Sequence, residues 1–213
     1  MTTQPAAPQQ VSLNLAEPGT PRRRLGVAVA VTVVLGAALG GLVGLVAGRV
    51  PGLITAAALV LLLLGLTWLS GRRRLWLEGT RLVAKTIGRK AVDLRQAERI
   101  ELMVTDVRGT RTIGLLVSAS GKTINLPVAI YSGTGGRELG ILALRRLADA
   151  LAASENTSGL VFSELFVAQL RAEAKGEAAA ERPLYRLASL APAGRLAQRL
   201  RTDAVTRFVA SLD

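Results

Sequence analysis

The 213-residue sequence contains neither cysteine nor histidine, and only 3% of its residues are aromatic. Without cysteine the chain forms no disulfide, thiolate nucleophile or cysteine-ligated metal centre. Without histidine it lacks the commonest general base and metal ligand, which excludes a Ser-His-Asp triad. These absences argue against most hydrolases and metalloenzymes. We therefore expect a protein that is not an enzyme, and we infer no catalytic residue, cofactor, metal site or small-molecule substrate.

Acidic residues are scarce as well. The chain has 15 Asp and Glu against 27 Lys and Arg, which gives a formal net charge of +12. The few aromatic residues leave little surface for base stacking, so nucleic acid is not an expected partner. The basic residues, nearly all of them arginine, instead suit the anionic inner leaflet of a bacterial plasma membrane. We therefore expect anionic membrane lipids as a partner.

Charged side chains are absent from two long apolar stretches, residues 25–48 and 53–70. About 20 helical residues cross the hydrocarbon core of a bilayer. The sequence predicts a transmembrane helical hairpin over residues 22–74, with spans at about 25–48 and 51–70. Glycine and proline in residues 48–52 predict a tight turn between the spans. The alternatives are two buried helices of a soluble domain, or an export signal cleaved near residues 28–30.

Arginines flank the open end of this predicted hairpin, whereas its turn carries only Arg49 and the only acid in residues 1–74 is Glu17. The flanking arginines are Arg22, Arg23, Arg24, Arg72, Arg73 and Arg74. Positively charged residues stay on the cytoplasmic side of a membrane. We expect a multi-pass protein of the plasma (inner) membrane with both termini in the cytoplasm, and these six arginines to contact lipid headgroups.

Glycines recur every four residues along the first span, at Gly36, Gly40, Gly44 and Gly48. Residues four apart share one helix face, and a stripe of small residues lets helices in lipid approach closely. The stripe predicts helix packing in one of two ways. It joins copies of the chain in a homo-oligomer, as a glycine zipper, or it packs against the second span, where Ala56 to Ala58 and Gly65 are small. Neither span carries an ionisable residue that could line a pore.

The N-terminal residues 1–21 are rich in Pro, Gln, Thr and Ala. Such a composition does not support a core, so we predict a disordered tail. Val11, Leu13 and Leu15 alternate with polar residues, but the run is too short to predict a stable strand.

Short β-branched runs separated by glycine-containing turns predict an antiparallel sheet or small barrel in residues 75–154. An amphipathic helix is expected from about residue 137 to 153. The glycine-rich residues 132–136 lack the lysine of a phosphate-binding loop, so we interpret them as a lead-in to that helix. The basic residues Lys85, Arg89, Lys90 and Arg95 either face anionic lipid or form an ordinary solvated surface.

Two spans followed by strands and one amphipathic helix resemble the bacterial PH-like (pleckstrin-homology-like) membrane proteins over roughly residues 22–153. Residues 76–83 match the opening hairpin, residues 91–94 with 98–100 the next strand pair, and residues 123–127 the last strand. The resemblance implies a strongly bent antiparallel sheet capped by a helix, and a binding or scaffold module without enzymatic activity. PH domains often bind phosphoinositides through a basic loop between the first two strands. The corresponding residues 78–80 are short and acidic here, which does not favour such a site.

Helical patterns continue through residues 155–213. Residues 160–170 predict an amphipathic helix that ends near residue 175, Pro183 opens a short helix through Leu190, and Pro192 opens another that includes Leu196 and Leu200. These helices either pack onto the sheet and one another, which we favour, or lie on the membrane or a partner.

The sequence thus predicts a membrane α+β protein with a disordered tail (residues 1–21), a transmembrane hairpin (22–74), a PH-like domain (75–154) and a helical C-terminal region (155–213). Its expected function is non-enzymatic: the cytoplasmic domain binds a partner or scaffolds an assembly at the inner leaflet. The alternative is an accessory subunit of a larger membrane complex, assembled through the glycine stripe and the C-terminal helices.

Overall fold

The structure, a computed structural model, describes residues 10–15, 21–71, 73–86, 88–192 and 196–212. The chain divides into two compact units. One comprises residues 16–73 and 86–88 and is built on a helical hairpin. The other comprises residues 1–15, 74–85 and 89–213 and is here called the sheet-and-helix unit.

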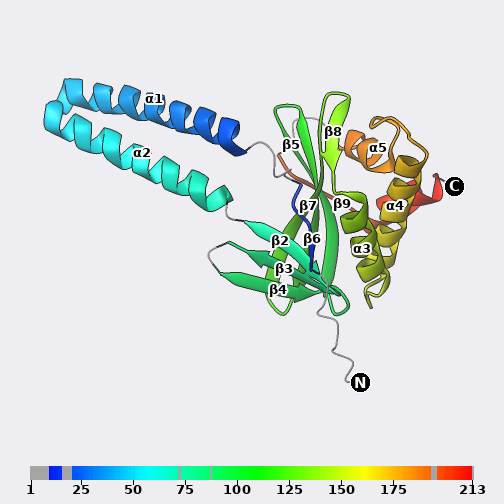
Figure 1. Cartoon of the computed structure of the whole chain (residues 1–213). Coiled ribbons are helices and arrows are strands. Elements are labelled where there is room, and N and C mark those ends of the chain that lie inside the picture. Colours follow the sequence, from blue (N-terminus) through cyan, green and yellow to red (C-terminus); the bar gives the residue numbers. More distant parts are fainter. Residues whose placement is uncertain (1–9, 16–20, 72, 87, 193–195, 213) are drawn as a thin grey trace, which may run out of the picture. The chain divides into compact units, whose positions relative to one another are not determined.

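The helical hairpin consists of α1 (Pro21–Ala47) and α2 (Arg49–Gly71), which run side by side (Figure 1). Gly48 alone separates the two helices, at a φ of +97° that favours glycine. The predicted turn of residues 48–52 was therefore too long. Pro51 lies in the first turn of α2, where proline removes no intrahelical hydrogen bond, so it does not delay the start of the helix.

Apolar side chains cover the outside of this hairpin. Val29–Ala47 and Arg49–Leu66 are long and apolar enough to cross a membrane. Their large apolar residues remain exposed, with Val46 at 91%, Leu45 at 85% and Leu61 at 71%. Two buried helices of a soluble domain would instead hide these side chains within the chain.

The glycine stripe of α1 faces α2 of the same chain. A Cβ atom at Gly40 would collide with the Cβ of Ala56 and lie 2.8 Å from the carbonyl oxygen of Gly52, and one at Gly36 would collide with Val60. Gly44 and Gly52 approach backbone to backbone, since a Cβ at Gly52 would lie 2.6 Å from the Gly44 Cα. Three of the four predicted packing glycines thus bring the helices together. Gly48 forms the turn, and the space beside Gly65 is open.

We predict that Gly40→Leu separates α1 from α2, whereas Gly41→Leu at the neighbouring position does not. The first substitution inserts a side chain against Ala56 and Gly52, while nothing lies within 4 Å of a Cβ at Gly41. Overpacking of a tight contact costs about 1–3 kcal/mol. Thermal unfolding of the detergent-solubilised protein should show a lower Tm for Gly40→Leu only. Equal losses in both variants would contradict this packing.

The sheet-and-helix unit contains two antiparallel sheets. The four-stranded sheet has the order β1-β2-β3-β4, and the five-stranded sheet the order β8-β7-β6-β5-β9. The strands of the first are β1 (Gln10–Ser12), β2 (Arg74–Glu78), β3 (Arg81–Lys85) and β4 (Arg89–Asp93). Those of the second are β5 (Arg99–Val107), β6 (Thr110–Ala119), β7 (Lys122–Ser132), β8 (Gly135–Glu138) and β9 (Gln198–Leu200). The predicted antiparallel strands are confirmed as two sheets.

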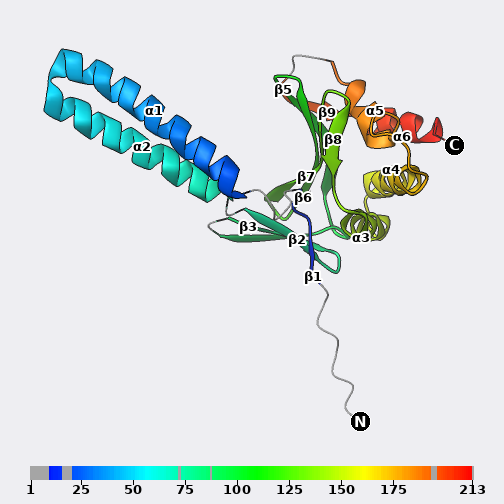
Figure 2. The ribbon, with the colours of Figure 1, turned by 45° about the horizontal axis from the view of Figure 1, so that its top comes forward.

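Alternation along the strands sets the core. In β5 the side chains of Ile100, Leu102 and Val104 are buried, while the residues between them are partly exposed. Helices α3 (Ile141–Ala152), α4 (Thr157–Ala174), α5 (Pro183–Ser189) and α6 (Thr202–Ala210) lie on one side of the five-stranded sheet (Figures 1 and 2). Phe162 and Phe166 of α4 are fully buried in this core.

The prediction of a disordered tail is wrong for residues 10–15. Val11 pairs with Leu77 across β1 and β2, Leu13 is completely buried, and its amide donates to the Leu75 carbonyl oxygen at 2.9 Å. The short alternation therefore completes the edge of a sheet whose other strands lie more than 60 residues away. Residues 1–9 and 16–20 lie outside the described residues.

The predicted helix boundaries need two corrections. Residues 135–138 form β8, so the capping helix begins at Ile141, and the glycine-rich segment contains the β7–β8 turn at residues 133 and 134. Leu200 lies in β9, so the last helix begins at Thr202. Pairing across the sheet explains both differences, because β8 pairs with β7 and β9 pairs with β5.

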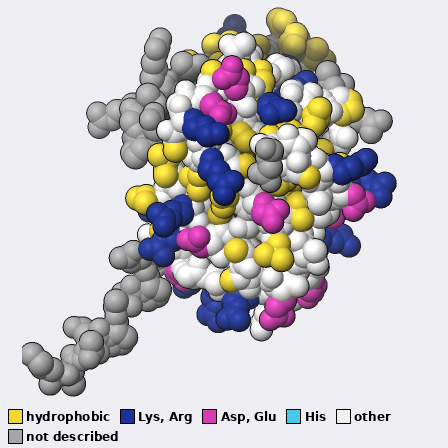
Figure 3. All heavy atoms as spheres, turned by 90° about the vertical axis from the view of Figure 1, so that its right-hand side faces the viewer, with side chains coloured by type: hydrophobic (Ala, Val, Ile, Leu, Met, Phe, Trp, Pro, Cys, Tyr) yellow, Lys and Arg dark blue, Asp and Glu magenta, His cyan; other side chains and the backbone are white. Residues whose placement is uncertain are grey.

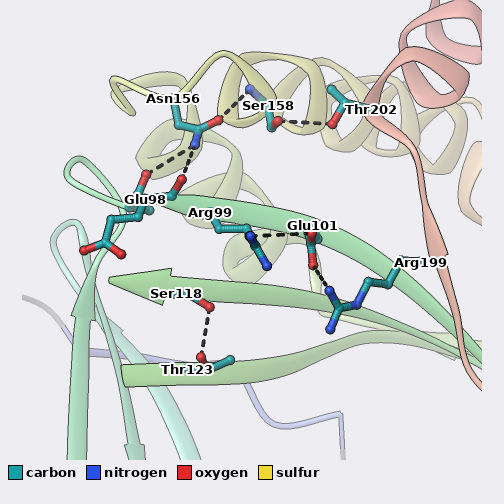
Figure 4. A network of polar contacts seen from close by, with 10 residues as sticks. Glu98, Arg99, Glu101, Ser118, Thr123, Asn156, Ser158, Arg199 and Thr202 are labelled. Carbon is teal, nitrogen blue, oxygen red and sulfur yellow. Dashed lines mark hydrogen bonds and ion pairs between the residues drawn. The ribbon is translucent and has the colours of Figure 1, made fainter. Parts of the chain in front are cut away.

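Polar contacts attach the C-terminal segment to the rest of the unit (Figure 4). Glu101 of β5 pairs with Arg199 of β9 at 3.3 Å, and the Ser158 and Thr202 hydroxyls are 3.2 Å apart. Asn156 caps α4 by accepting from the Ser158 amide, and its side-chain amide donates to the Ala97 and Glu98 carbonyl oxygens. Residues 75–154 and 155–213, which the sequence analysis separated, thus belong to one unit.

Candidate functional site

A pocket of about 710 Å³ opens where the β5–β6 hairpin, the β7–β8 turn and α5 meet. Its volume falls in the range of small-molecule sites. The polar and charged residues that line it include Asp106, Arg108, Arg111, Tyr131, Tyr185 and Ser189. The apolar ones include Val107, Ala188 and Leu196. The pocket thus combines charge, aromatic rings and apolar surface.

The rim of the pocket is a strained turn. Val107 pairs with Thr110, so Arg108 and Gly109 alone form the loop of the β5–β6 hairpin. Their φ angles are +51° and +78°, as a type I′ turn requires. Glycine adopts this backbone freely, but for arginine the left-handed region costs about 1–2 kcal/mol. Asn or Asp is the residue usually found at the first position of such a turn.

Two of the three charges at the pocket neutralise one another. The Asp106 carboxylate accepts from the Gly109 amide at 3.2 Å and from Nε of Arg111 at 3.4 Å. Arg111 also donates from Nη1 to the Ala188 carbonyl oxygen of α5 at 3.2 Å. Arg108 is exposed, and no acidic side chain among the described residues pairs with it. The pocket therefore carries one uncompensated positive charge.

Two tyrosines contribute the aromatic surface of the pocket. The rings of Tyr131 and Tyr185 meet edge to face, with centroids 5.1 Å apart. Both hydroxyls are engaged: Tyr131 donates to Glu138 at 2.6 Å, and Tyr185 donates to the Gly133 carbonyl oxygen at 2.9 Å. Tyr131 is only 2% exposed, so the half-buried Tyr185 ring is the main aromatic surface that a ligand can meet.

Glu138 is the centre of the polar network behind these rings. Its second carboxylate oxygen accepts from Nη1 of Arg182 at 2.8 Å, and Nε of Arg182 donates to the Glu177 carbonyl oxygen. Burial raises the pKa of Tyr131, and the hydrogen bond and negative charge of Glu138 raise it further. Burial works against the charged form of Arg182, but the hydrogen bond and charge of Glu138, together with Glu173 and Tyr131, outweigh it, so the pKa of Arg182 is also raised.

These side chains form a candidate binding site, and its lining offers few groups for acid–base or metal chemistry. Among the described residues no cluster of three His, Cys, Asp or Glu could hold a metal ion. The one carboxylate of the pocket, on Asp106, is held by Arg111 and the Gly109 amide. The arrangement can attract an anion and cover an apolar or aromatic group.

The structure brings none of the predicted arginines to this pocket. Arg22, Arg23 and Arg24 belong to α1, Arg73 precedes β2, and Arg74 is the first residue of β2, opposite Lys85. Arg72 lies outside the described residues. Arg73 and Arg74 are exposed, and their predicted contact with lipid headgroups stays a prediction.

Sequence reasoning missed the pocket residues. The sequence contains only a weak indication of the turn: an Arg-Gly pair stands between two strand patterns, where Asn-Gly would be usual. The only two tyrosines of the chain lie 54 positions apart. Nothing along the chain indicates that Tyr131 and Tyr185 meet the turn at Arg108.

Comparisons with known proteins identify no relative. No family model, no curated protein and no solved structure matches the chain. The geometry of the pocket and the composition of the helical hairpin therefore carry the functional argument.

Removing the strained arginine should stabilise the protein. We predict that Arg108→Asn raises the free energy of unfolding by about 1 kcal/mol, because asparagine tolerates a positive φ better. Ser120→Asn is the matched control, since Ser120 holds the same position in the β6–β7 turn with a φ of +50°. Denaturant titration should show a gain for both variants. A loss of stability in Arg108→Asn would show that the arginine makes stabilising contacts.

The stability of the sheet-and-helix unit should fall as the pH rises above about 10. Tyr131 keeps its proton in the folded protein, whereas in the unfolded chain it ionises near the ordinary tyrosine pKa of about 10. A pKa raised by folding contributes stability below the unfolded value, and this contribution is lost at higher pH. Melting temperatures should fall less steeply with pH in Tyr131→Phe than in Tyr185→Phe. Parallel curves would contradict the role of Tyr131.

Proposed function

We propose that the protein is a non-enzymatic integral membrane protein whose sheet-and-helix unit binds a partner or scaffolds an assembly at the inner leaflet. One observation carries the membrane part: both helices of the hairpin expose large apolar side chains along lengths that suit a bilayer. A monomeric soluble protein rarely exposes a contiguous apolar surface of this extent. Lipid is the solvent that accommodates it.

The proposed orientation rests on charge. Three arginines precede the first span and three follow the second, while the turn carries one. The rule that positive charge stays inside supports a cytoplasmic location for both termini and for the sheet-and-helix unit. Anionic headgroups at that surface attract arginine by about 1 kcal/mol per residue.

The order of elements supports a PH-like assignment for the sheet-and-helix unit. Strands β2 to β4 belong to one antiparallel sheet, β5 to β7 belong to a second, and α3 follows with one buried face. Strands β1, β8 and β9 and helices α4 to α6 are additions to that plan. We propose a PH-like binding module elaborated by these segments.

The surface formed by the helices supports a water-exposed module. Figure 3 shows acidic, basic and apolar side chains interspersed on this side of the molecule. The exposed apolar residues of α3 and α4 include Ile141, Leu142 and Leu160. Apolar residues scattered among charges are ordinary for a surface in water.

An accessory subunit assembled through the glycine stripe is less favoured. Gly36 and Gly40 already face α2 within the chain, so they are not available to a second copy. The C-terminal helices likewise bury Phe162, Leu184 and Val205 in the core of their own unit.

Alkaline carbonate extraction tests the membrane assignment. An integral hairpin is held by apolar burial, so we expect the protein in the membrane pellet. Release into the supernatant would contradict the proposal.

The absence of native cysteine makes the orientation directly measurable. In intact spheroplasts a membrane-impermeant maleimide should label Arg49→Cys at the turn, whereas Lys122→Cys in the β6–β7 hairpin should react only after permeabilisation. The unsubstituted chain is the unlabelled control. The reverse pattern would contradict cytoplasmic termini.

A further inference from the structure

We propose that the pocket between the β5–β6 hairpin and α5 binds a small, singly charged anion with an apolar or aromatic part, and that Arg108 supplies the charge for it. This inference deepens the proposed role as a binding module, and it rests on that role for the sheet-and-helix unit but not on membrane insertion. The ligand class follows from three properties of the pocket.

Charge is the first property. Asp106 and Arg111 compensate each other, and Arg111 is further engaged by the Ala188 carbonyl oxygen. The exposed guanidinium of Arg108 is left without an acidic partner among the described residues. One available guanidinium matches one carboxylate or phosphodiester, which it can bind through two parallel hydrogen bonds. A dianion would require more hydrogen-bond donors than this one guanidinium provides.

The second property is the surface beside that charge. Tyr131 and Tyr185 form an edge-to-face pair, and Val107 and Leu196 are 50% and 75% exposed. Both tyrosine hydroxyls are already used in hydrogen bonds and Tyr131 is buried, so a ligand meets the Tyr185 ring together with the Val107 and Leu196 side chains. An anion with an apolar arm gains burial that inorganic phosphate or acetate cannot.

The third property is the backbone strain at Arg108. The two hairpin turns on either end of β6 have the same length and the same pattern of positive φ, yet one carries Ser120 and the other Arg108. Backbone strain clusters at functional sites, and of these two strained residues only Arg108 lines the pocket. Arg108 destabilises the turn in which it lies, lines the pocket and carries an unpaired charge. We therefore assign its side chain a role in binding.

Arg111 is a positioning residue in this scheme. It holds the start of β6 to the end of α5 through the Ala188 carbonyl oxygen, and so fixes two walls of the pocket. Its loss would widen the pocket and lower affinity indirectly.

Both tyrosines of the chain line the pocket, which supplies a specific probe. The full chain in neutral detergent, labelled with 3-fluorotyrosine, should give two ¹⁹F NMR signals. Titration with 3-phenylpropionate should shift them in a saturable manner. The uncharged 3-phenylpropionamide tests the need for charge, and acetate tests the need for the apolar arm; both should bind at least about tenfold more weakly.

Matched turn variants assign the charge to Arg108. Arg108→Asn should weaken binding of 3-phenylpropionate by about tenfold, the effect of losing one charge-assisted interaction. Ser120→Asn makes the same change in the other turn and should leave the dissociation constant unchanged. Unchanged affinity in Arg108→Asn, equal shifts with the amide, or no saturable shift would each overturn the proposal. Both variants keep the turn, so a folding failure does not obscure the result.

The anion comes either from a lipid headgroup or from a free carboxylate, and spectra in lipid nanodiscs and in detergent distinguish these two sources. In nanodiscs of phosphatidylglycerol the ¹⁹F signals should already be shifted, and 3-phenylpropionate should compete poorly, if the ligand is a lipid phosphodiester. The phosphate-free neutral detergent gives the reference, because phosphatidylcholine itself carries a phosphodiester. Identical spectra and affinities in the nanodiscs and in the detergent would assign the site to a free carboxylate. The outcome is independent of carbonate extraction, so failure of the pocket and failure of the membrane assignment are distinguishable.

Discussion

The carboxylate of Glu138 is the interaction on which the pocket depends. It accepts from Tyr131 of β7 and from Arg182 at the start of α5, and so joins the sheet to the C-terminal helices. Only 8% of this side chain is exposed. A hydrogen bond to a charged group typically contributes about 1.5–3 kcal/mol, and Glu138 accepts one from each of these two elements. Without this junction α5 would lose its position, and with it Tyr185 and the wall at Ala188.

Around this junction the unit combines rigid and strained parts. The sheet and α4 bury Phe162, Phe166 and the alternating side chains of β5, which gives a fixed frame. The β5–β6 turn extends from that frame and holds Arg108 in a conformation that suits another residue better. A rigid support keeps such a turn in place and presents its side chain at a defined position.

The helical hairpin follows different physics. In the proposed lipid environment apolar burial does not drive helices together, so close approach requires small residues. Gly36, Gly40 and Gly52 meet this requirement by letting backbone and small side chains touch. The turn between the helices is also short. Gly48 alone, with its positive φ, reverses the chain and keeps the two helices adjacent.

The sequence alone determined the features that depend on local composition and periodicity. The two apolar helices, the succession of antiparallel strands, and the helices beginning near residues 157 and 183 were predicted, because each is encoded by neighbouring residues. The strand at residues 10–12, the strands β8 and β9, and the pocket were not predicted. Each of these depends on a partner far along the chain: β1 needs β2, β9 needs β5, and Tyr131 needs Glu138 and Tyr185. Short segments such as these have little structure of their own, so only the tertiary arrangement, by supplying the missing hydrogen bonds and apolar contacts, decided their conformation.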